Sequence, residues 1–426
     1  MDLSKAFDTI DHNILLKKLN FYGLDTISLE WFKSYLTNRQ QFVLVNSEKS
    51  PLQTILTGVP QGSILGPLLF LIYINDIKFC SNIFTFLCFA DDTTITLSIC
   101  TKNILCKYCQ NYDYIDETLI NFELQKLYDW LAINKLSLNA KKTKYMVFHN
   151  HQRKLDNCHH CSFLVEQPSK IKINNIPIEK VKTHIFLGIT LHENLSWNDH
   201  IQYIANKISK TIGIIRCIKS YIPLNILKTI YNSLIMPYLQ YGILVWGFEC
   251  QRLEILQKKC IRLIVNCYPY EHTEKFFKSL NILKIGDIFK YKCLILFYKF
   301  KYDSLPIYLS DIFSYFIPNN VYSIRSHENK ILQEPYCKLK TTENCLRFSL
   351  PKTINNLCED EIILLNADNI NILKNKLKKY ILANYSDLAC DNDDCFACMR
   401  ILFNPNYLSI IMQHINIFAY LYRFIS

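Results

Sequence analysis

The sequence predicts a mixed α/β (α+β) fold with an antiparallel sheet and flanking helices, followed by an all-α unit. The runs 83–89 and 94–97 combine aromatic, β-branched and alternating residues on either side of Asp91-Asp92, which is typical of a β-hairpin. Apolar residues at helical spacing precede and follow this hairpin. Near residue 198 the strand patterns stop and helical spacing continues alone.

The part of the chain before the hairpin is expected to be mainly helical. Residues 10–38 contain two short amphipathic patterns separated by Gly23, a residue that commonly ends a helix. Residues 41–45 form a short apolar run that predicts a strand. The Gly/Pro-rich loop 58–63 then leads into an apolar stretch that predicts a helix over 65–74.

Helix and strand patterns alternate after the hairpin. Apolar residues recur at helical spacing over 115–131, and residues 144–148 read as a strand. Residues 171–178 predict a second hairpin around Asn174-Asn175, because Asn tolerates the positive φ of tight turns. Residues 186–191 predict a further strand, in which Gly188 allows a close approach or a bulge.

A long amphipathic helix is expected to open the all-α unit. Asn198 or Asp199 is a suitable N-cap for it. Further helical segments follow at 227–234 and 253–263, and no element is predicted beyond about residue 310. The apolar face of the first helix consists of isoleucines spaced three or four residues apart, namely Ile201, Ile204, Ile208, Ile212 and Ile215.

The composition narrows the class of protein. The 426 residues suffice for two or three domains, and half of them are apolar. The 48 Lys and Arg exceed the 37 Asp and Glu, for a net charge of +11, which suits a polyanion such as nucleic acid. No secretory signal or membrane span is evident, and the 18 cysteines follow no disulfide spacing. A nuclear or cytoplasmic protein with reduced thiols is therefore expected.

The dipeptide Asp91-Asp92 is the strongest indication of chemistry. Asp-Asp is a poor choice for a hairpin turn, and its two like charges repel. A divalent metal ion would offset that repulsion. Nucleotidyl transfer by two metal ions needs carboxylates from separate segments, and Asp2, at the end of an expected opening strand, can supply the other. The alternatives are an exposed acidic turn and, for Asp2, a helix N-cap.

Five motifs in order resemble those of reverse transcriptases from non-LTR (LINE-type, jockey-like) retrotransposons. Residues 2–12 read DLSKAFDTIDH and resemble motif A, and residues 58–70 read GVPQGSILGPLLF and resemble motif B. The string FADD at 89–92 resembles motif C. Residues 130–144 and the string FLG at 186–188 resemble motifs D and E. Several motifs at suitable separations are far more specific than one alone.

This resemblance implies a right-hand polymerase architecture. Residues 1–192 would be the palm and residues 193–305 an all-α thumb and connection. The resemblance fades beyond about residue 300, so residues 306–426 form a C-terminal region that is expected to be helical in class but whose fold is not assigned. Members of the family place fingers before motif A. Because Asp2 follows Met1 directly, the chain is expected to be truncated at its N-terminus, with the fingers largely absent.

The resemblance also implies roles at the reaction centre. Asp2 and Asp91 would be the principal ligands of two Mg²⁺ ions, for which Mn²⁺ is a possible substitute, and Asp92 would belong to the same acidic cluster. Lys142 would lie near the triphosphate and act as a general acid. The alternative for Lys142 is a solvated surface lysine. Phe7 would lie under the incoming sugar and exclude a 2′-hydroxyl, or would simply be a core residue.

The resemblance further assigns residues to substrate and nucleic-acid contacts. Motif B would contact the incoming nucleotide and template, motif E would form the primer grip, and helical lysines would contact phosphates. A turn residue or a solvated lysine is the alternative at each position. The residues concerned are Gly58, Pro60, Gln61 and Gly62 for motif B, Phe186, Leu187 and Gly188 for the grip, and Lys207, Lys210, Lys219 and Lys228 for the phosphates.

The function implied is RNA-directed DNA synthesis, by attack of a primer 3′-hydroxyl on a deoxynucleoside triphosphate. The partners would be an RNA template, a DNA primer or target DNA and the dNTP, with no membrane; the oligomeric state is not predicted. One alternative is a catalytically dead remnant that keeps the fold and binds nucleic acid. Another is a zinc-dependent binding module, but the spacing of the Cys/His pairs argues against structural zinc. Those pairs are Cys106 with Cys109, Cys158 to Cys161, and Cys395 with Cys398 near Cys390.

Overall fold

The structure is a computed structural model, and it confirms a chain of mixed helix and strand with small antiparallel sheets. The chain falls into two compact units, Met1–His184 and Ile185–Ser426. No helix among the described residues is long and apolar enough to span a membrane. The structure describes residues 1–97, 117–148, 171–248, 250–315, 331–336 and 345–386.

The first unit alternates helices with short strands. Its helices are α1 (His12–Phe21), α2 (Thr26–Leu36), α3 (Leu65–Ile74), the 3₁₀ helix η1 (Asn75–Phe79) and α4 (Glu117–Ile133). Its strands are β1 (Gln40–Gln41), β2 (Leu44–Val45), β3 (Glu48–Lys49), β4 (Gln53–Thr54), β5 (Thr85–Phe89), β6 (Asp92–Thr96), β7 (Lys144–Tyr145), β8 (Lys172–Ile173), β9 (Ile176–Pro177), β10 (Glu179–Lys180) and β11 (Thr183–Phe186), the last of which crosses the boundary between the units.

The second unit is helical after one strand. Its elements are β12 (Ile189–His192), α6 (Asn198–Ile218), α7 (Leu224–Leu234), α8 (Met236–Gln240), α9 (Ile243–Trp246), α10 (Gln251–Val265), α11 (Glu274–Ser279), α12 (Ile285–Lys301), α13 (Ile307–Ser310), α15 (Leu346–Asn355), α16 (Glu359–Leu364) and α17 (Ile370–Ala383).

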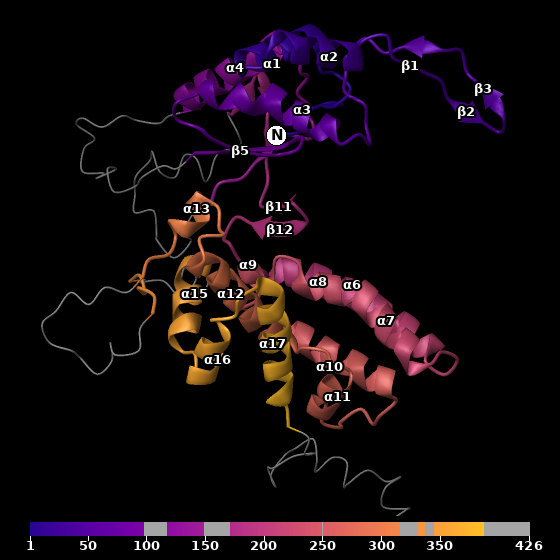
Figure 1. The fold of residues 1–426 in the computed structure, drawn as a ribbon, viewed down its shortest axis with the longest axis vertical. Helices are drawn as coiled ribbons and strands as arrows, with labels where there is room; N and C mark the ends of the chain where they lie inside the picture. The colour runs from indigo at the N-terminus through magenta and orange to yellow at the C-terminus, as the bar shows by residue number, and fades with distance from the viewer. Residues whose placement is uncertain (98–116, 149–170, 249, 316–330, 337–344, 387–426) are drawn as a thin grey trace, which may run out of the picture. The chain divides into compact units, whose positions relative to one another are not determined.

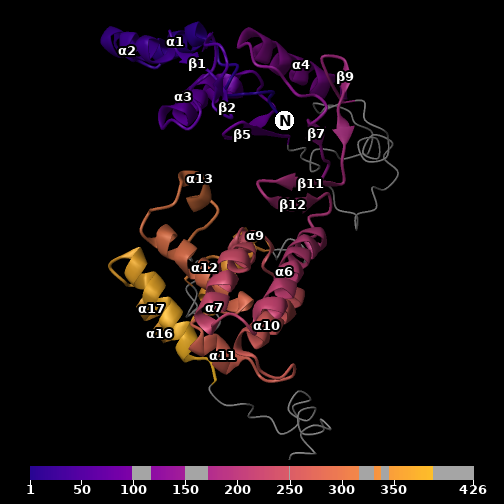
Figure 2. The ribbon, with the colours of Figure 1, turned by 90° about the vertical axis from the view of Figure 1, so that its right-hand side faces the viewer.

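The helices expected before the hairpin are confirmed. The Asp11 carboxylate accepts from the Ile14 N–H at 3.0 Å and caps α1. Gly23, at φ +94°, follows the end of α1 and turns the chain into α2. Figure 2 shows α1 and α2 side by side with α3 next to them. Leu15, Phe70 and other buried residues of these helices form the core of the unit.

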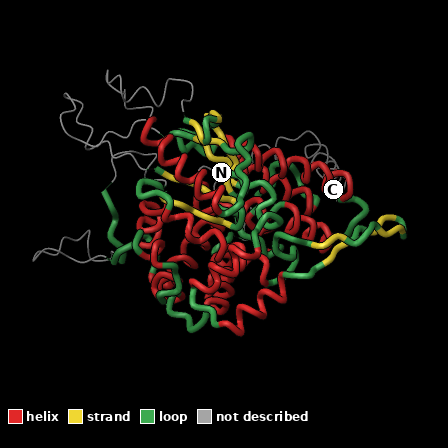
Figure 3. Tube along the Cα trace, turned by 90° about the horizontal axis from the view of Figure 1, so that it is seen from above, coloured by secondary structure: helices red, strands yellow, loops and turns green. Residues whose placement is uncertain are grey.

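The four short strands β1 to β4 form an exposed arm. β1 pairs with β4 and β2 with β3, both antiparallel, and every residue in them is exposed. Figures 1 and 3 show this arm extending from the helices. The single strand predicted at 41–45 is thus two shorter strands, because the chain changes pairing partner between them.

The other ladders of the first unit are also two-stranded. β5 and β6 pair antiparallel over five residue pairs, and β8 pairs with β9 around Asn174-Asn175, as predicted. Both asparagines have positive φ, +47° and +61°. β7 and β10 pair parallel, which differs from the purely antiparallel expectation. Residues 35 positions apart in the chain, such as Lys144 and Glu179, pair there, a geometry that no local pattern encodes.

The strand predicted at 186–191 is wrong at its centre. Leu187 and Gly188 form the two-residue turn between β11 and β12, with φ of +44° and +78°. A hairpin turn with both φ positive favours Gly at the second position. The Tyr241 hydroxyl donates to the Leu187 carbonyl at 2.6 Å and holds the less favourable leucine there. The local alternation of apolar residues concealed this turn.

The long amphipathic helix predicted after residue 198 is confirmed as α6. All five isoleucines of its predicted face are buried, at 6% exposure or less. They pack with residues of α7, α10 and α12 into one core. Figure 1 shows α6, α7, α8 and α10 grouped together in this unit.

A buried glutamine joins three helices of the second unit. Gln257 on α10 donates to the Tyr231 hydroxyl and to the Leu283 carbonyl, and accepts from the Ile285 N–H, each at 2.9 Å. All of its amide groups are therefore used except one lone pair, as a fully buried amide requires. Burial raises the pKa of Tyr231. This junction links α7, α10 and the start of α12.

Helices continue where the sequence predicted no element. α12 packs against α15 and α17, and Figure 1 shows α15, α16 and α17 beside it. Leu294 of α12 and Leu350 of α15 belong to the same buried cluster as Leu373 and Leu377 of α17. The region after residue 306 is thus partly helical and shares its core with α12.

His200 makes the second unit sensitive to acid. Its Nδ1 accepts from the Thr190 N–H at 3.3 Å, while its Nε2 is buried without a partner. Burial lowers the pKa of His200 below its ordinary value. The folded state is therefore expected to bind a proton less readily than the unfolded state. The contribution of the neutral imidazole to the free energy of unfolding is then lost as pH falls below about 6.5.

We predict that the fall in melting temperature between about pH 7.5 and about pH 5.5 is smaller in His200→Asn than in the parent chain. The asparagine oxygen can still accept from the Thr190 N–H. His192→Asn is the control, because the His192 Nδ1 also accepts a backbone N–H, that of Asn194 at 3.1 Å, from a more exposed position. Equal pH dependence in both variants would contradict the assignment.

Candidate active site

The backbone of residues 1–4 forms the centre of a small sheet-like layer in the first unit. The Met1 nitrogen donates to the Thr93 carbonyl of β6 at 2.8 Å. On the other side, Leu3 bridges Leu138, and the Asn139 N–H donates to the Asp2 carbonyl at 2.9 Å. Asp2 is therefore held between β6 and the segment that follows α4.

Asp91 and Asp92 lie at the end of the β5–β6 hairpin. Phe89 pairs with Asp92, so the two-residue turn is Ala90-Asp91, and Asp92 is already the first residue of β6. The turn had been expected at Asp91-Asp92. The positive φ falls on Ala90, at +52°, a conformation that Gly would adopt at lower cost. Both aspartates are exposed, and the sheet pairing brings their end of the hairpin beside residues 1 and 2.

The electrostatics of the Met1 amino group show that two carboxylates share its surroundings. Burial lowers the pKa of this group, while the charges of Asp92 and Asp2 act in the opposite direction. The sequence separates these two aspartates by ninety positions, and the fold brings them to one place. Two acidic residues from separate segments therefore lie near one another.

The donor set suits a hard divalent ion. Carboxylate oxygens are the ligands that Mg²⁺ prefers, and it keeps several waters of its own. Among the described residues no three His, Cys, Asp or Glu side chains are gathered as tightly as a formed metal site would be. Asp2 and Asp92 have the chemistry that such an ion prefers and lie near the same amino group, and Asp91 is the chain neighbour of Asp92.

Lys142 lies on the opposite side of Asp2 from the hairpin. Its Nζ is 3.9 Å from the Asp2 carboxylate, and its side chain is 71% exposed. The next residue, Thr143, is buried, and its hydroxyl accepts from the Asp2 N–H at 3.3 Å and donates to the Asn139 carbonyl at 2.9 Å. Thr143 therefore sets the position of both Asp2 and Lys142. The sequence showed it only as a member of a Lys-Thr-Lys run.

The loop of residues 57–62 packs backbone to backbone against residues 7–10. The Gly58 N–H donates to the Ile10 carbonyl at 2.7 Å, and the Val59 N–H donates to the Phe7 carbonyl at 2.9 Å. A Cβ at Gly58 would lie 2.8 Å from backbone atoms of Asp8, and φ there is +89°. Only glycine meets both conditions.

The other residues of this loop face the turn that contains Asp8. Gln61 donates from Nε2 to the Asp8 carboxylate at 2.7 Å and is exposed. The Pro60 carbonyl accepts from the Ser63 hydroxyl at 2.7 Å at the start of α3. Gly62, with φ +78°, has open space around its Cβ position. Gln61 is therefore held beside the residues that follow Asp2 and is accessible to a ligand.

Phe7 is half-buried against α3. Its ring lies 4.7 Å from that of the fully buried Phe70, at an interplanar angle of 40°. Its carbonyl accepts the hydrogen bond from the Val59 N–H, in the loop of residues 57–62 that contains motif B. The ring is thus both packed and partly exposed, which is compatible with a core role and with contact to a substrate.

A buried polar network was not predicted. The Tyr73 hydroxyl donates to the Asn134 carbonyl at 2.7 Å and accepts from the Asp11 N–H at 3.4 Å. Lys135 pairs with the Asp11 carboxylate at 2.6 Å and lowers its pKa. Burial raises the pKa of Tyr73 to about 12. The network joins α1, α3 and the end of α4, and its members are too far apart in sequence for a local pattern to reveal.

The predicted primer-grip and thumb residues belong to the other unit or its boundary. Phe186 ends β11, and Leu187 and Gly188 form the turn described above. Lys207 and Lys210 are exposed on α6, and Lys207 lies over the Tyr203 ring. Lys219 donates to the Asn266 side chain at 2.7 Å. Lys228 is half-buried on α7.

The predicted Cys/His pairs lie outside the described residues. This applies to the pairs at 106–109, 158–161 and 395–398, and to Cys390. The nine cysteines that fall within the described ranges, spread over both units, are free thiols.

Comparison with known proteins identifies the class. Residues 1–191 match the family model described as Reverse transcriptase (RNA-dependent DNA polymerase). These residues include Asp2, the motif-B loop and the Asp91-Asp92 hairpin. They are a reverse transcriptase domain, and their relatives show that it is of the type found in non-LTR retrotransposons.

The relatives are RNA-directed DNA polymerases of mobile elements. The chain is 25% identical over 300 residues to the probable RNA-directed DNA polymerase from transposon BS of Drosophila melanogaster, covering 67% of this chain and 31% of that protein. It is 26% identical over 302 residues to the RNA-directed DNA polymerase from mobile element jockey of the same organism, covering 67% and 30%. The chain thus spans about a third of the length of these relatives.

We predict that Gly58→Ala destabilises the first unit much more than Gly23→Ala. Both glycines have positive φ, +89° and +94°, but a Cβ at Gly23 would meet nothing within 4 Å. Gly23→Ala is expected to cost about 1 kcal/mol of unfolding free energy from backbone strain alone. Gly58→Ala adds overpacking against backbone atoms and is expected to cost about 3 kcal/mol or more.

Chemical denaturation of the two variants measures this difference. Comparable losses in both would show that the motif-B loop can move away from residues 7–10 without cost.

Proposed function

We propose that this chain is the polymerase portion of a non-LTR retrotransposon protein and that it catalyses RNA-directed DNA synthesis. The observation that best supports this is the placement of Asp2 beside β6, where the Met1 and Leu3 backbones pair on either side of it. In the proposed site, that placement would bring together the carboxylates of two motifs that are far apart in sequence. The substrates would be an RNA template, a DNA primer or target DNA, and a deoxynucleoside triphosphate.

The architecture proposed for this activity is that of a right-hand polymerase. Residues 1–192 would be the palm, residues 193–305 the thumb and connection, and residues 306–426 a C-terminal region. The mixed helices and strands of the first unit and the helices of the second support this division. The β11–β12 hairpin, with Phe186, Leu187 and Gly188 at its turn, would be the primer grip.

Asp2, Asp91 and Asp92 would hold two Mg²⁺ ions. When bound, such ions lower the pKa of an attacking hydroxyl and stabilise charge on the leaving oxygens. The contribution of the chain would be to hold Asp2 and Asp92 on paired backbone segments and Asp91 in the turn between β5 and β6. Lys142, near Asp2 and largely exposed, would donate a proton to the leaving pyrophosphate.

The nucleotide would lie over the motif-A and motif-B loops. The half-exposed ring of Phe7 would contact the sugar and clash with a 2′-hydroxyl, which favours deoxynucleotides. Gln61 and the backbone of Gly58, Pro60 and Gly62 would contact the nucleotide and the template. The hydrogen bond from Gln61 to Asp8 supports this, because it fixes an exposed amide at the edge of the loop.

We predict that Asp91→Asn lowers primer extension on an RNA template with Mg²⁺ by about a hundredfold or more, because it removes one of the charges that bind the ions. Asp129→Asn is the control. Asp129 is exposed on α4 in the same unit, and its side chain accepts from Gln125, a role that asparagine can keep.

Equal extension by Asp91→Asn and the parent chain would refute the assignment of Asp91. A parent chain that binds RNA but extends no primer would favour the alternative function, a non-catalytic protein that retains the fold and binds nucleic acid.

We predict that Phe7→Val reduces discrimination against ribonucleotides. Removal of the ring opens space for a 2′-hydroxyl, so the ratio of kcat/KM for a dNTP to that for the matching NTP is expected to fall about tenfold or more. Single-nucleotide extension measures both constants. An unchanged ratio, with the melting temperature lowered by loss of the Phe70 contact, would leave Phe7 as a core residue only.

A further inference from the structure

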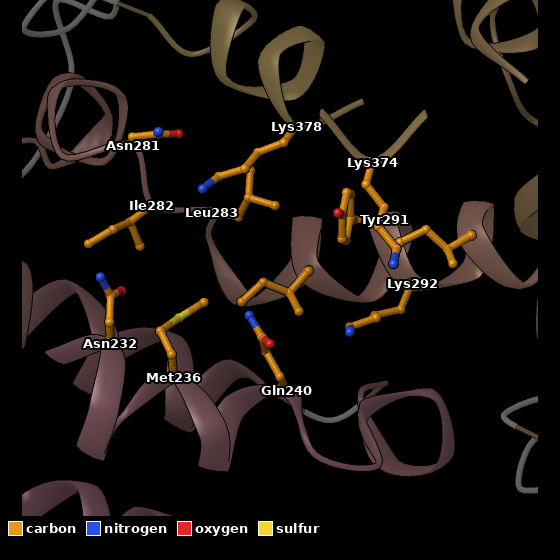
Figure 4. Close-up of a pocket in the computed structure, with 12 residues that line it drawn as sticks. Asn232, Met236, Gln240, Asn281, Ile282, Leu283, Tyr291, Lys292, Lys374 and Lys378 are labelled. Atoms are coloured by element: carbon orange, nitrogen blue, oxygen red, sulfur yellow. The ribbon is translucent and has the colours of Figure 1, made fainter. Parts of the chain in front are cut away.

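A cavity of about 320 Å³ in the second unit lies between α7, α8, α12 and α17. Figure 4 shows the side chains of Lys374 and Lys378 entering it from α17 and that of Lys292 from α12, with the amides of Asn232 and Gln240 on the facing side. None of its twelve lining residues is acidic. The polar side-chain groups of this cavity are thus ammonium groups, amides and the Tyr291 hydroxyl.

The three lysines have no carboxylate partner among the ion pairs of the described residues. Other lysines nearby do, as Lys290 of α12 pairs with Glu361 at 2.6 Å. Lys374 and Lys378 are half-buried, whereas Lys376 and Lys379 of the same helix are exposed. On α17, the two lysines that enter the cavity are therefore the half-buried ones.

A fourth lysine adds to the positive potential. Burial lowers the pKa of Lys378, and the charge of Lys228 on α7 lowers it further. Like charges held together in a partly buried place cost stability unless an anion neutralises them. The chain places no such anion among the residues that line the cavity.

The chemistry of the lining matches a phosphate group. Lysine ammonium groups bind phosphate as point charges, and Asn and Gln amides donate to phosphate oxygens. Such contacts fix nucleic acid in register without reading its bases. A cavity of this size can receive a phosphate together with part of its sugar, and its walls of Met236, Ile282 and Tyr291 can contact the apolar parts of a nucleotide.

We propose that the cavity lined by Lys292, Lys374 and Lys378 is a binding site for a backbone phosphate of the RNA on which this protein acts. The proposal rests on the proposed function for the choice of RNA. The site would bind RNA at a place separate from the proposed reaction centre. Two of its three lysines come from α17, a helix for which the sequence predicted no role.

The test is fluorescence anisotropy of a labelled single-stranded RNA, titrated with the full chain at several salt concentrations. The variant Lys374→Gln with Lys378→Gln is compared with the control Lys376→Gln with Lys379→Gln, which removes the same charge from the exposed face of the same helix. Loss of one phosphate contact is expected to reduce the slope of log K against log salt by about 0.7. Affinity is expected to fall about tenfold, the equivalent of one charge-assisted hydrogen bond.

Stability is measured alongside binding. Removal of Lys378 relieves its repulsion with Lys228, so the cavity variant should melt no lower than the parent chain. If it unfolds, the single variant Lys292→Gln on α12 is expected to show the same change in salt slope. Equal affinities and slopes for the cavity variant and the exposed-face control would overturn the proposal.

Two further readouts separate the possible causes of failure. The first is the melting temperature with inorganic phosphate at matched ionic strength. If phosphate raises the melting temperature of the parent chain but not of the cavity variant, and the two bind RNA equally, the cavity is a site for free phosphate. That result would overturn the assignment to a backbone phosphate of RNA. The second is primer extension. If the parent chain extends a primer and both double variants bind RNA equally, the phosphate site is overturned and the polymerase activity stands. Absent extension with a selective loss of RNA binding would overturn the polymerase activity and support the site.

Discussion

The close approach of Gly58 to residues 7–10 is the constraint on which the rest of the reverse transcriptase domain depends. Backbone contacts at 2.7 to 2.9 Å leave no room for a Cβ. Because of them, the loop that begins α3 lies directly against the turn that follows Asp2. Phe7 and Gln61 obtain their positions from this contact, and α3 then packs its buried face, including Phe70, on α1.

The carboxylates depend on a second set of backbone contacts, which are all long-range. Residues 1–4 pair with β6 on one side and with residues 137–139 on the other. Asp91 and Asp92 remain exposed at the hairpin end, and Asp2 is half-buried beside them. Exposed carboxylates on hydrogen-bonded backbone segments are accessible to ions and charged ligands from solvent.

The second unit has a different organisation. Its core is formed by helix faces, and the buried amide of Gln257 specifies how three of them meet. Lys290 of α12 pairs with Glu361. The three lysines that line the cavity between α12 and α17, by contrast, have no carboxylate partner within the described part of the chain.

Sequence motifs identified most of the candidate site, because motifs A, B and C each depend on residues that are adjacent in the chain. Helical periodicity likewise predicted α3, α4 and α6, since one face of each helix is buried. The turn at Leu187-Gly188 was missed because its local pattern is that of a strand, and Tyr241 holds it from 54 residues away.

By itself, the sequence determined the family of the first domain, the candidate acidic residues and the helices with a strong apolar face. Only the tertiary structure decided that Thr143 positions Asp2, that Tyr73 joins three helices and that Lys292 and Lys378 share a cavity. The physical reason is that these contacts join residues distant in the chain, and their energy comes from burial and hydrogen bonds that exist only once the core is packed.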